Sequence, residues 1–595
     1  MTEATAPRID ISVQETVPTI HYQVAMPQPE THLFEVRLQI VNHKSSILDL
    51  KMPVWTPGSY LVREYAKNLQ DFTAFAGDKP LSWRKVSKNH WQINKDDVSS
   101  EVTVSYRIFA NELSVRTNHL DATHGYFNGA ALFLRLLGTD NLPISVTVLP
   151  PYPQWQVTTA LPKIKEQFNT FYASDFDTLV DSPFEIGDHQ LYNFEVLGKP
   201  HELAIWGQGN FQVQPLISDI QKIVQVEAQM FGGLPYDRYL FLVHLFAQAY
   251  GGLEHKNCCS LIYQRFGFRT QDKYERFIQL VAHEFFHLWN VKRIRPKALE
   301  VFNYDQESYT PSLWFCEGTT SYYDLIIPLR AGIYEVKTYL NYWSKEISRF
   351  LTTPGRKVQS LSESSFDAWI KLYRPDANSG NSQISYYLKG EMVSLLLDLL
   401  IRARHHNRRS LDDVMRQMWH EFGEPEIGYT PQQLQAVIES VAELDLTDFF
   451  KRYIDGTDEL PFDQYLEPFG LHLVTEKEDE PYLGMKVNTE NGREIIKFVE
   501  TASPAQLAGI DAGDELLAIA GIKVTAHQLS DRLKDYQPHD TIQVTIFHQD
   551  ELRTVSLTLG QPRPVKYQVV PIKNPNPIQQ ENFAGWLGTQ LSTIC

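Results

Sequence analysis

The sequence predicts a multidomain α+β protein: a β-sandwich-like N-terminal domain, a mostly helical domain and a small strand-rich module. Three observations lead to this prediction. The chain has 595 residues, too many for one core, because domains usually hold about 100–200 residues. Apolar and polar residues alternate in the first part of the chain, as in strands with one buried face, and helical spacing takes over in the middle. Short alternating segments then return near the C-terminus.

Half-buried strands are expected in the N-terminal part. Period-two alternation recurs in segments 34–40, 102–108 and 144–148. Helical spacing is scarce before about residue 212. We therefore predict a β-sandwich-like domain over residues 1–180.

The middle of the chain is predicted to be a separate domain over residues 181–460. It opens with an amphipathic helix that ends at the glycine pair 232–233, and a short apolar strand follows over 239–246. Residues 271–455 carry helical spacing and helix-start signals, such as Thr430 followed by proline.

The C-terminal part returns to strands. A linker-like stretch, 458–468, precedes a module predicted over 470–562, with one helix around 525–536. The tail, 563–595, is rich in proline, glutamine and asparagine, so we expect a loosely packed extension.

Composition narrows the classes of partner. The net charge of −17 and a pI near 5.6 argue against nucleic acid or an anionic membrane surface as the main partner. No apolar run is long enough for a membrane span, and the first residues do not resemble a signal peptide. Four cysteines form neither a disulfide framework nor a structural zinc pattern. We expect a cytoplasmic protein.

Residues 281–290 read V-A-H-E-F-F-H-L-W-N and carry the strongest chemical signal. His283 and His287 are four apart, so on a helix both side chains lie on one face and can bind one ion. Glu284, beside the first histidine, is placed to take a proton from the attacking water. The alternative is two ordinary helix histidines with a surface glutamate.

A catalytic zinc needs a third protein ligand and an open fourth position. Glu317 lies within P-S-L-W-F-C-E-G-T-T-S-Y-Y (311–323), among apolar residues where an unpaired carboxylate is costly. A metal would remove that cost. The alternative is a helix-start glutamate or an ion-pair partner. Cys316, directly before it, is interpreted as a small buried residue.

These motifs together resemble one family. H-E-F-F-H-L-W-N, then L-W-F-C-E-G-T-T-S-Y-Y, preceded by G-G-L-E-H, is similar to the M61 glycyl aminopeptidases, which are gluzincin zinc peptidases. P-V-W-T-P-G-S-Y-L-V-R-E-Y (53–65) and D-S-P-F-E-I-G (181–187) extend the resemblance. It implies a thermolysin-like catalytic domain and one Zn²⁺ per chain, held by His283, His287 and Glu317. Glu284 matches the family's general base.

The resemblance also implies how a peptide is held. G-G-L-E-H (251–255) matches the family's exopeptidase motif, in which Glu254 would bind the free α-amine of the substrate. We expect the strand before Gly251 to pair with an extended peptide, and Gly251 and Gly252 to permit close backbone approach. The alternative is a turn with surface-exposed Glu254 and His255.

A tyrosine hydroxyl for the oxyanion is expected in I-S-Y-Y-L-K-G (384–390). Counting back from Lys389-Gly390 favours Tyr387, whereas counting on from Ile384-Ser385 favours Tyr386. We choose Tyr387, with a packing role for both tyrosines as the alternative.

The C-terminal module resembles a PDZ domain, because Y-L-G-M (482–485) matches a carboxylate-binding loop. It would bind a protein C-terminus or pack on the catalytic domain. The whole chain is thus expected to be a zinc aminopeptidase that prefers N-terminal glycine or alanine on peptides with a free N-terminus. Its rivals are an endopeptidase on the same fold and a PDZ-bearing binding protein with a vestigial zinc site.

Overall fold

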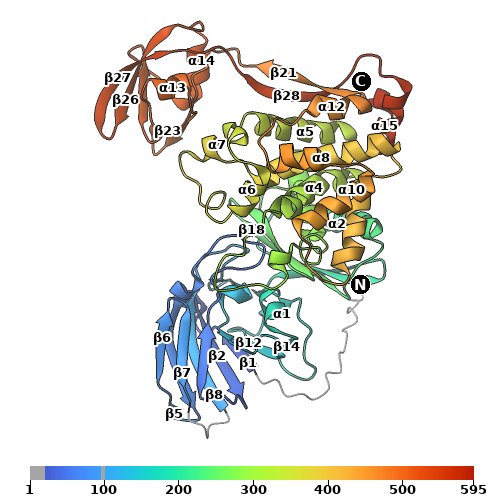
Figure 1. Ribbon diagram of the computed structural model, residues 1–595. Coiled ribbons are helices and arrows are strands. Elements are labelled where there is room, and N and C mark those ends of the chain that lie inside the picture. The colour runs from blue at the N-terminus through green and yellow to red at the C-terminus, as the bar shows by residue number, and fades with distance from the viewer. Residues whose placement is uncertain (1–19, 96–100, 595) are drawn as a thin grey trace. The chain divides into compact units, whose positions relative to one another are not determined.

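The computed structural model describes residues 20–95 and 101–594 (Figure 1). The chain divides into two compact units. One contains the residues up to Ser308 together with Trp419–Gly428, and the other contains Tyr309–Met418 and the residues from Tyr429 onward.

The first unit begins with three β-sheets, which confirm the β-rich N-terminal domain. The largest has the order β14 (Thr170–Ala173), β12 (Ile144–Leu149), β1 (Ile20–Ala25), β2 (Leu33–Val41), β8 (Glu101–Phe109), β4 (Leu69–Ala76) and β5 (Lys79–Pro80). The second has the order β11 (Arg135–Leu136), β3 (Ile47–Lys51), β7 (His90–Asn94) and β6 (Trp83–Ser87). The third has the order β13 (Gln156–Thr159), β15 (Phe184–Gly187), β10 (His124–Phe127) and β9 (His119–Leu120). The short helix α1 (Phe176–Val180) precedes β15.

The alternation of apolar and polar residues in the sequence matches the alternation of buried and exposed side chains along these strands. In β2, every second residue from Phe34 to Ile40 is buried, and the residues between them are exposed or half-buried. The strand pairs with β1 and β8, so its apolar face joins a single core with theirs. The period of two therefore predicts both the strands and the face that they bury.

A five-stranded sheet and two long helices complete the first unit. The strand order is β16 (Gln190–Val196), β17 (Lys199–Trp206), β18 (Tyr239–Phe246), β20 (Cys258–Gln264) and β19 (Tyr250–Glu254), and the helices are α2 (Val213–Phe231) and α3 (Gln271–Phe286). Helix α2 ends at Gly232, whose φ of 83° is the left-handed conformation that glycine adopts without strain. The sequence thus predicts α2, its stop and β18 correctly.

The expectation that β18 pairs with a peptide is wrong. Both edges of β18 are occupied, by β17 and by β20. The edge of the sheet is β19, the G-G-L-E segment itself, which pairs with β20 alone among the described strands. The chain reverses direction after β18 and again after β19, so that β20 lies between these two strands. The G-G-L-E motif on β19, rather than β18, is therefore at the open edge.

The second unit contains the helical region. Its helices before the C-terminal module are α4 (Thr319–Arg330), α5 (Val336–Leu351), α6 (Leu361–Phe366), α7 (Ser379–Ser382), α8 (Tyr386–His405), α9 (Leu411–Met418), α10 (Pro431–Ala442), α11 (Thr447–Phe449) and α12 (Phe462–Leu466). Helix α8 is buried along most of its length and packs against α4 and α5 (Figure 1). The linker-like stretch is partly helical, because it contains α12.

The C-terminal module is a small sheet with the order β22 (Met485–Glu490), β23 (Arg493–Val499), β24 (Glu515–Ile519), β26 (Thr541–His548) and β27 (Glu551–Thr558). The short strand β25 (Ile522–Lys523) pairs with β24, and the helices are α13 (Pro504–Leu507) and α14 (Leu529–Leu533). Strand β22 is an edge strand, with β23 as its one neighbour in this sheet.

The prediction of a loosely packed tail is wrong. Strand β28 (Pro564–Pro571) pairs with β21 (Leu471–Lys477), and its backbone N–H groups at Tyr567 and Val569 donate hydrogen bonds to the hydroxyls of Ser348 and Ser344 on α5. Helix α15 (Pro577–Leu587) buries Phe583 and Trp586. The polar composition of the tail gave a wrong prediction because burial of these two aromatic side chains is enough to hold α15 in place.

None of the helices among the described residues is long and apolar enough to cross a bilayer.

Candidate active site

Two histidines lie together at the C-terminal end of α3. The ring centroids of His283 and His287 are 4.6 Å apart. His287 Nδ1 lies 2.6 Å from the carbonyl oxygen of Asn290, which can only accept, so Nδ1 carries the hydrogen. The other nitrogen, Nε2, therefore keeps its lone pair. A backbone carbonyl behind a histidine is the usual device that orients this side chain toward a metal.

Glu284 faces the same space as His287. A carboxylate oxygen of Glu284, one of Glu254 and a ring nitrogen of His287 all lie within 4.8 Å of one another. Strand β19 approaches so closely that a Cβ atom on Gly252 would lie 2.1 Å from the Glu284 carboxylate. Only glycine fits there, which explains one of the paired glycines of the sequence motif.

Glu254 ends β19 as a buried carboxylate. It is 3% exposed, and its Oε1 has no hydrogen-bond partner among the described residues. His255 is also buried, so the alternative of a surface turn does not hold. Burying a carboxylate oxygen without a partner is unfavourable, so an incoming cation such as an ammonium group would be stabilised here.

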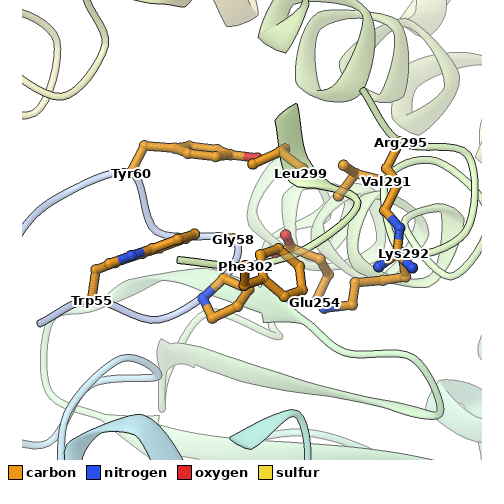
Figure 2. A pocket seen from close by; sticks show the side chains of 10 residues that line it. Trp55, Gly58, Tyr60, Glu254, Val291, Lys292, Arg295, Leu299 and Phe302 are labelled. Atoms are coloured by element: carbon orange, nitrogen blue, oxygen red, sulfur yellow. The ribbon is translucent and has the colours of Figure 1, made fainter. Parts of the chain in front are cut away.

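A small pocket surrounds Glu254, and part of it comes from the N-terminal domain. Figure 2 shows Trp55 and Tyr60 on one side and Lys292 and Arg295 on the other. A Cβ atom on Gly58 would lie 2.4 Å from Glu254 Oε1, and Gly58 has a φ of 85°. The segment P-G-S-Y therefore closes tightly over the carboxylate.

Asp181 fixes the chain around this pocket. It accepts hydrogen bonds from Lys292 Nζ at 2.7 Å, from the Lys256 backbone N–H at 2.7 Å and from His255 Nδ1 at 3.1 Å. Burial alone would raise the pKa of Asp181, but Lys292 and His255 hold that pKa well below its usual value. The carboxylate thus stays charged and ties the end of β19 to the residues after α3.

Sequence reasoning missed this role of Asp181, although the segment D-S-P-F-E-I-G was singled out. It also missed Arg116, whose Nη2 donates to the carbonyl oxygen of Gly252 at 3.0 Å. No spacing in the sequence relates Asp181 or Arg116 to β19, because both reach it from the N-terminal domain. For Asp181 alone, the sequence offered a signal: an acidic residue shortly before a strand.

In the second unit, Glu317 lies in a π-helical turn, Trp314–Gly318, and is 2% exposed. The turn packs on α8 with little clearance, since a Cβ atom on Gly318 would lie 2.5 Å from the Cα atom of Gly390. Such turns recur at functional sites because they redirect one side chain within a helix. The glycine pair lets Glu317 lie beside the first turn of α8.

Tyr387 opens α8 next to Glu317. Burial and the Glu317 carboxylate raise the pKa of Tyr387 well above its usual value, so the hydroxyl remains a hydrogen-bond donor. The Tyr373 hydroxyl lies 3.1 Å from the hydroxyls of both Tyr386 and Tyr387. Tyr386 is fully buried, whereas Tyr387 is half-buried. The structure thus places Tyr387 as the more accessible of the two.

The sequence-predicted residues fall in both units. The first brings together His283, His287, Glu284, Gly251, Gly252 and Glu254, and the second brings together Glu317 and Tyr387. Histidine imidazoles and glutamate carboxylates are donors that suit zinc.

Comparisons with known proteins agree with this chemistry. Residues 21–188 match the peptidase M61 N-terminal domain, residues 276–393 match the M61 glycyl aminopeptidase, and residues 481–559 match a PDZ domain. None of the curated proteins matches the chain.

Among solved structures, an aminopeptidase N family protein from Idiomarina loihiensis is 32% identical, with a TM-score of 0.90 over 96% of this chain and 100% of that one. An M1 zinc metallopeptidase mutant from Deinococcus radiodurans is 10% identical, with a TM-score of 0.47 over 74% of this chain and 94% of that one.

The fold and the site define a metallo-aminopeptidase with a C-terminal PDZ domain. The chain belongs to the M61 glycyl aminopeptidase family.

Proposed function

We propose that the protein is a zinc-dependent aminopeptidase that removes N-terminal residues, glycine and alanine first, from peptides with a free amine. One observation carries this proposal. The buried Glu254 carboxylate, with an oxygen that lacks a partner among the described residues, lies at the end of an edge strand beside Glu284 and His287. A site that binds an ammonium group next to a metal ligand selects the first peptide bond of a chain.

His283, His287 and Glu317 would hold the metal. This assignment rests on donor type, on the orientation of His287 by Asn290 and on the match of Glu317 to the family motif. Zinc, when bound, lowers the pKa of water and polarises the carbonyl of the scissile bond.

The remaining steps belong to side chains of the protein. Gly251 and Gly252 pair with the peptide backbone along the open edge of β19, and Glu254 binds the α-amine. Glu284 takes a proton from the attacking water and then gives it to the leaving amine. Tyr387 donates a hydrogen bond to the oxyanion, because its raised pKa keeps the hydroxyl protonated.

The preference for small residues is proposed from the pocket around Glu254. A Cβ atom added to Gly58 would lie 2.4 Å from the Glu254 carboxylate, and Tyr60 lines the same pocket. Little room is left beside the bound amine. Bulky N-terminal side chains would therefore be excluded by contact with this segment.

The test compares glycyl- and alanyl-4-nitroanilide with leucyl-4-nitroanilide and with the N-acetylated forms, with chelator and with zinc restored. We expect chelator-sensitive cleavage of the free-amine glycyl and alanyl substrates only. Glu254→Gln should raise KM for them, because it removes the charge, while Glu195→Gln at the opposite edge of the same sheet should not.

Two other outcomes would replace the proposal. Cleavage of acetylated substrates at similar rates would identify an endopeptidase on this fold. Stoichiometric zinc without cleavage of any substrate would leave the PDZ domain as the functional part.

We further propose that the PDZ domain binds a protein C-terminus along β22. The strand is an edge strand, and the preceding loop contains Gly484 with a φ of 80°, as an anion-binding turn of backbone N–H groups requires. Fluorescence anisotropy of C-terminal peptides and of their C-amidated forms tests this. Equal affinity for both forms would contradict it.

A further inference from the structure

A second group of potential ligands lies in the first unit and shares no residue with α3. His124 comes from β10, Glu185 from the neighbouring strand β15, and His244 from β18 of the five-stranded sheet. One ligand atom of each lies within 4.8 Å of the others. We call these three residues the sheet cluster. It spans the N-terminal domain and the catalytic domain.

Every member of the sheet cluster is closed off from solvent. His124 and His244 are 0% exposed, and Glu185 is 1% exposed. Charged or polar side chains are rarely buried this fully unless they are paired or bind a metal. The burial alone therefore calls for a partner.

Protein hydrogen bonds leave most of these atoms unsatisfied. Neither ring nitrogen of His124 has a hydrogen-bond partner among the described residues, and the same holds for Glu185 Oε1 and for His244 Nδ1. Within the described residues, one hydrogen bond joins members of the sheet cluster, between His244 Nε2 and Glu185 Oε2 at 2.7 Å. An ion pair between His244 and Glu185 would explain that contact, but it would not explain why His124 is buried without a hydrogen-bond partner among the described residues.

His119 lies beside His124 but is not a member of the sheet cluster. Its ring centroid is 4.8 Å from that of His124, and the ligand atoms of His119, Asp121 and His124 also lie within 4.8 Å of one another. The Nδ1 atom of His119 has no hydrogen-bond partner among the described residues. His189 is a further neighbour, but its Nε2 lies 2.8 Å from the Thr158 hydroxyl.

The ring of Trp206 fixes the orientation of His124. The two rings stack with centroids 3.6 Å apart and planes 15° apart. An imidazole held in one plane is already oriented for binding a transition metal.

We propose that His124, Glu185 and His244 bind a second divalent transition-metal ion of the zinc type. Two imidazoles and one carboxylate favour zinc over calcium or magnesium, which prefer oxygen ligands.

The ion would tie the N-terminal domain to the sheet that carries β19. The Tyr126 hydroxyl already bonds to Ser260 Oγ at 2.9 Å, and Tyr126 packs edge-on against His244 at 4.6 Å. Ser260 lies on β20, directly opposite Leu253 of β19. Binding at the sheet cluster thus stabilises the folded state through contacts that extend to the peptide-binding strand.

The test uses the full-length chain with the first site removed, as the double variant His283→Ala/His287→Ala. It is loaded with excess zinc, dialysed against metal-free buffer and analysed by plasma mass spectrometry. We expect two zinc ions per wild-type chain and one per double variant. A double variant that retains no zinc, with its fold intact by circular dichroism, overturns the proposal.

Further substitutions in the double variant locate the ion. His124→Ala should reduce its zinc content from one to zero, and Glu185→Gln covers the case in which His124→Ala does not fold. His201→Ala is the matched control. His201 is a buried histidine of the five-stranded sheet, and both of its ring nitrogens have hydrogen-bond partners. Retention of zinc by either ligand variant would contradict the assignment.

Cobalt substitution separates this site from cysteine binding. Cobalt in the double variant should give weak visible bands without the intense near-ultraviolet charge transfer of a thiolate. Strong charge transfer would place the ion at a buried cysteine and overturn the proposal. Added zinc should also raise the Tm of the double variant and not that of the double variant carrying His124→Ala.

Discussion

Two clusters of histidine and glutamate in the first unit use similar donors in opposite settings. The α3 cluster, His283, Glu284 and His287, lies on one helix beside the open edge strand β19, and His283 is only half-buried. The sheet cluster comes from three strands, and each of its members is closed off from solvent. The first therefore adjoins an open strand edge, whereas the second is enclosed.

This difference shows that access from solvent decides which role a cluster of histidine and glutamate can have. A metal with an open position and a neighbouring carboxylate base can process a substrate, while a metal enclosed by buried side chains can only hold strands together. The pocket around Glu254 adjoins the α3 cluster, which fits this division. The predictions below test each half of it, in order of decreasing effect.

Glu284→Gln should have the largest effect. Without the general base, we expect kcat to fall by about 10³-fold, within the range that acid–base catalysis contributes. Zinc content should not change, because Glu284 is not a proposed ligand. Steady-state kinetics and metal analysis on the same preparation check both expectations.

Asp272→Asn, at the exposed start of α3, is the matched control and should keep kcat within about two-fold, as expected of a surface change. If Glu284→Gln retained more than a tenth of wild-type kcat, the α3 cluster would not use this residue as its base.

Much of the α3 cluster could be predicted from the sequence because its two histidines follow the period of one helix. His283 and His287 are i and i+4, so the spacing alone places them together. Glu254 and its glycines needed the family resemblance, and their position on an edge strand needed the sheet order.

The sheet cluster could not be predicted in this way. His124, Glu185 and His244 are distant in sequence, and their encounter depends on the packing of two sheets, which no local period encodes. The tail is an intermediate case. Asn576 and Gln579 form a capping box around Pro577, a signal for α15 that was present but outweighed by composition.

Asp181→Asn should have the next largest effect, on stability. The variant keeps the shape of the side chain but leaves buried Lys292 without its charge partner, and breaking such a pair costs about 3 kcal/mol. The α3 cluster would then be shown to depend on a contact from the N-terminal domain. Urea unfolding at neutral pH measures the difference, with the exposed Asp188→Asn as the control.

The pH dependence of this difference has a definite sign. Because the pKa of Asp181 is lowered in the folded state, its contribution is present above the pKa of an unfolded aspartate, about 4, and is lost as the pH falls. The difference in stability between wild type and Asp181→Asn should therefore begin to narrow below about pH 4 and keep narrowing as the pH falls further. A gap that widened in acid would contradict the proposed ion pair.

Gly252→Ala tests how closely β19 must approach the base. The added methyl group would lie 2.1 Å from the Glu284 carboxylate, so that side chain must move. We expect kcat to fall by about 10- to 100-fold, because displacement by about 1 Å costs this much at a catalytic group. Leu253→Met, on the opposite face of the strand, should stay within about two-fold. If wild type, Gly252→Ala and Leu253→Met had equal kcat values, the close approach of β19 to Glu284 would not matter for catalysis.

Trp206→Leu should have the smallest effect, confined to the sheet cluster. It removes the ring that stacks on His124, so the ligand loses its fixed orientation while its nitrogen remains. In the His283→Ala/His287→Ala background, we expect about ten-fold weaker zinc binding in competition with a chromophoric chelator, as for other groups that orient a ligand. Phe194→Leu removes a similar stack, on His201 in the same central sheet, and should leave zinc affinity unchanged. If both variants weakened zinc binding equally, general loosening of the sheet, rather than the orientation of His124, would be the cause.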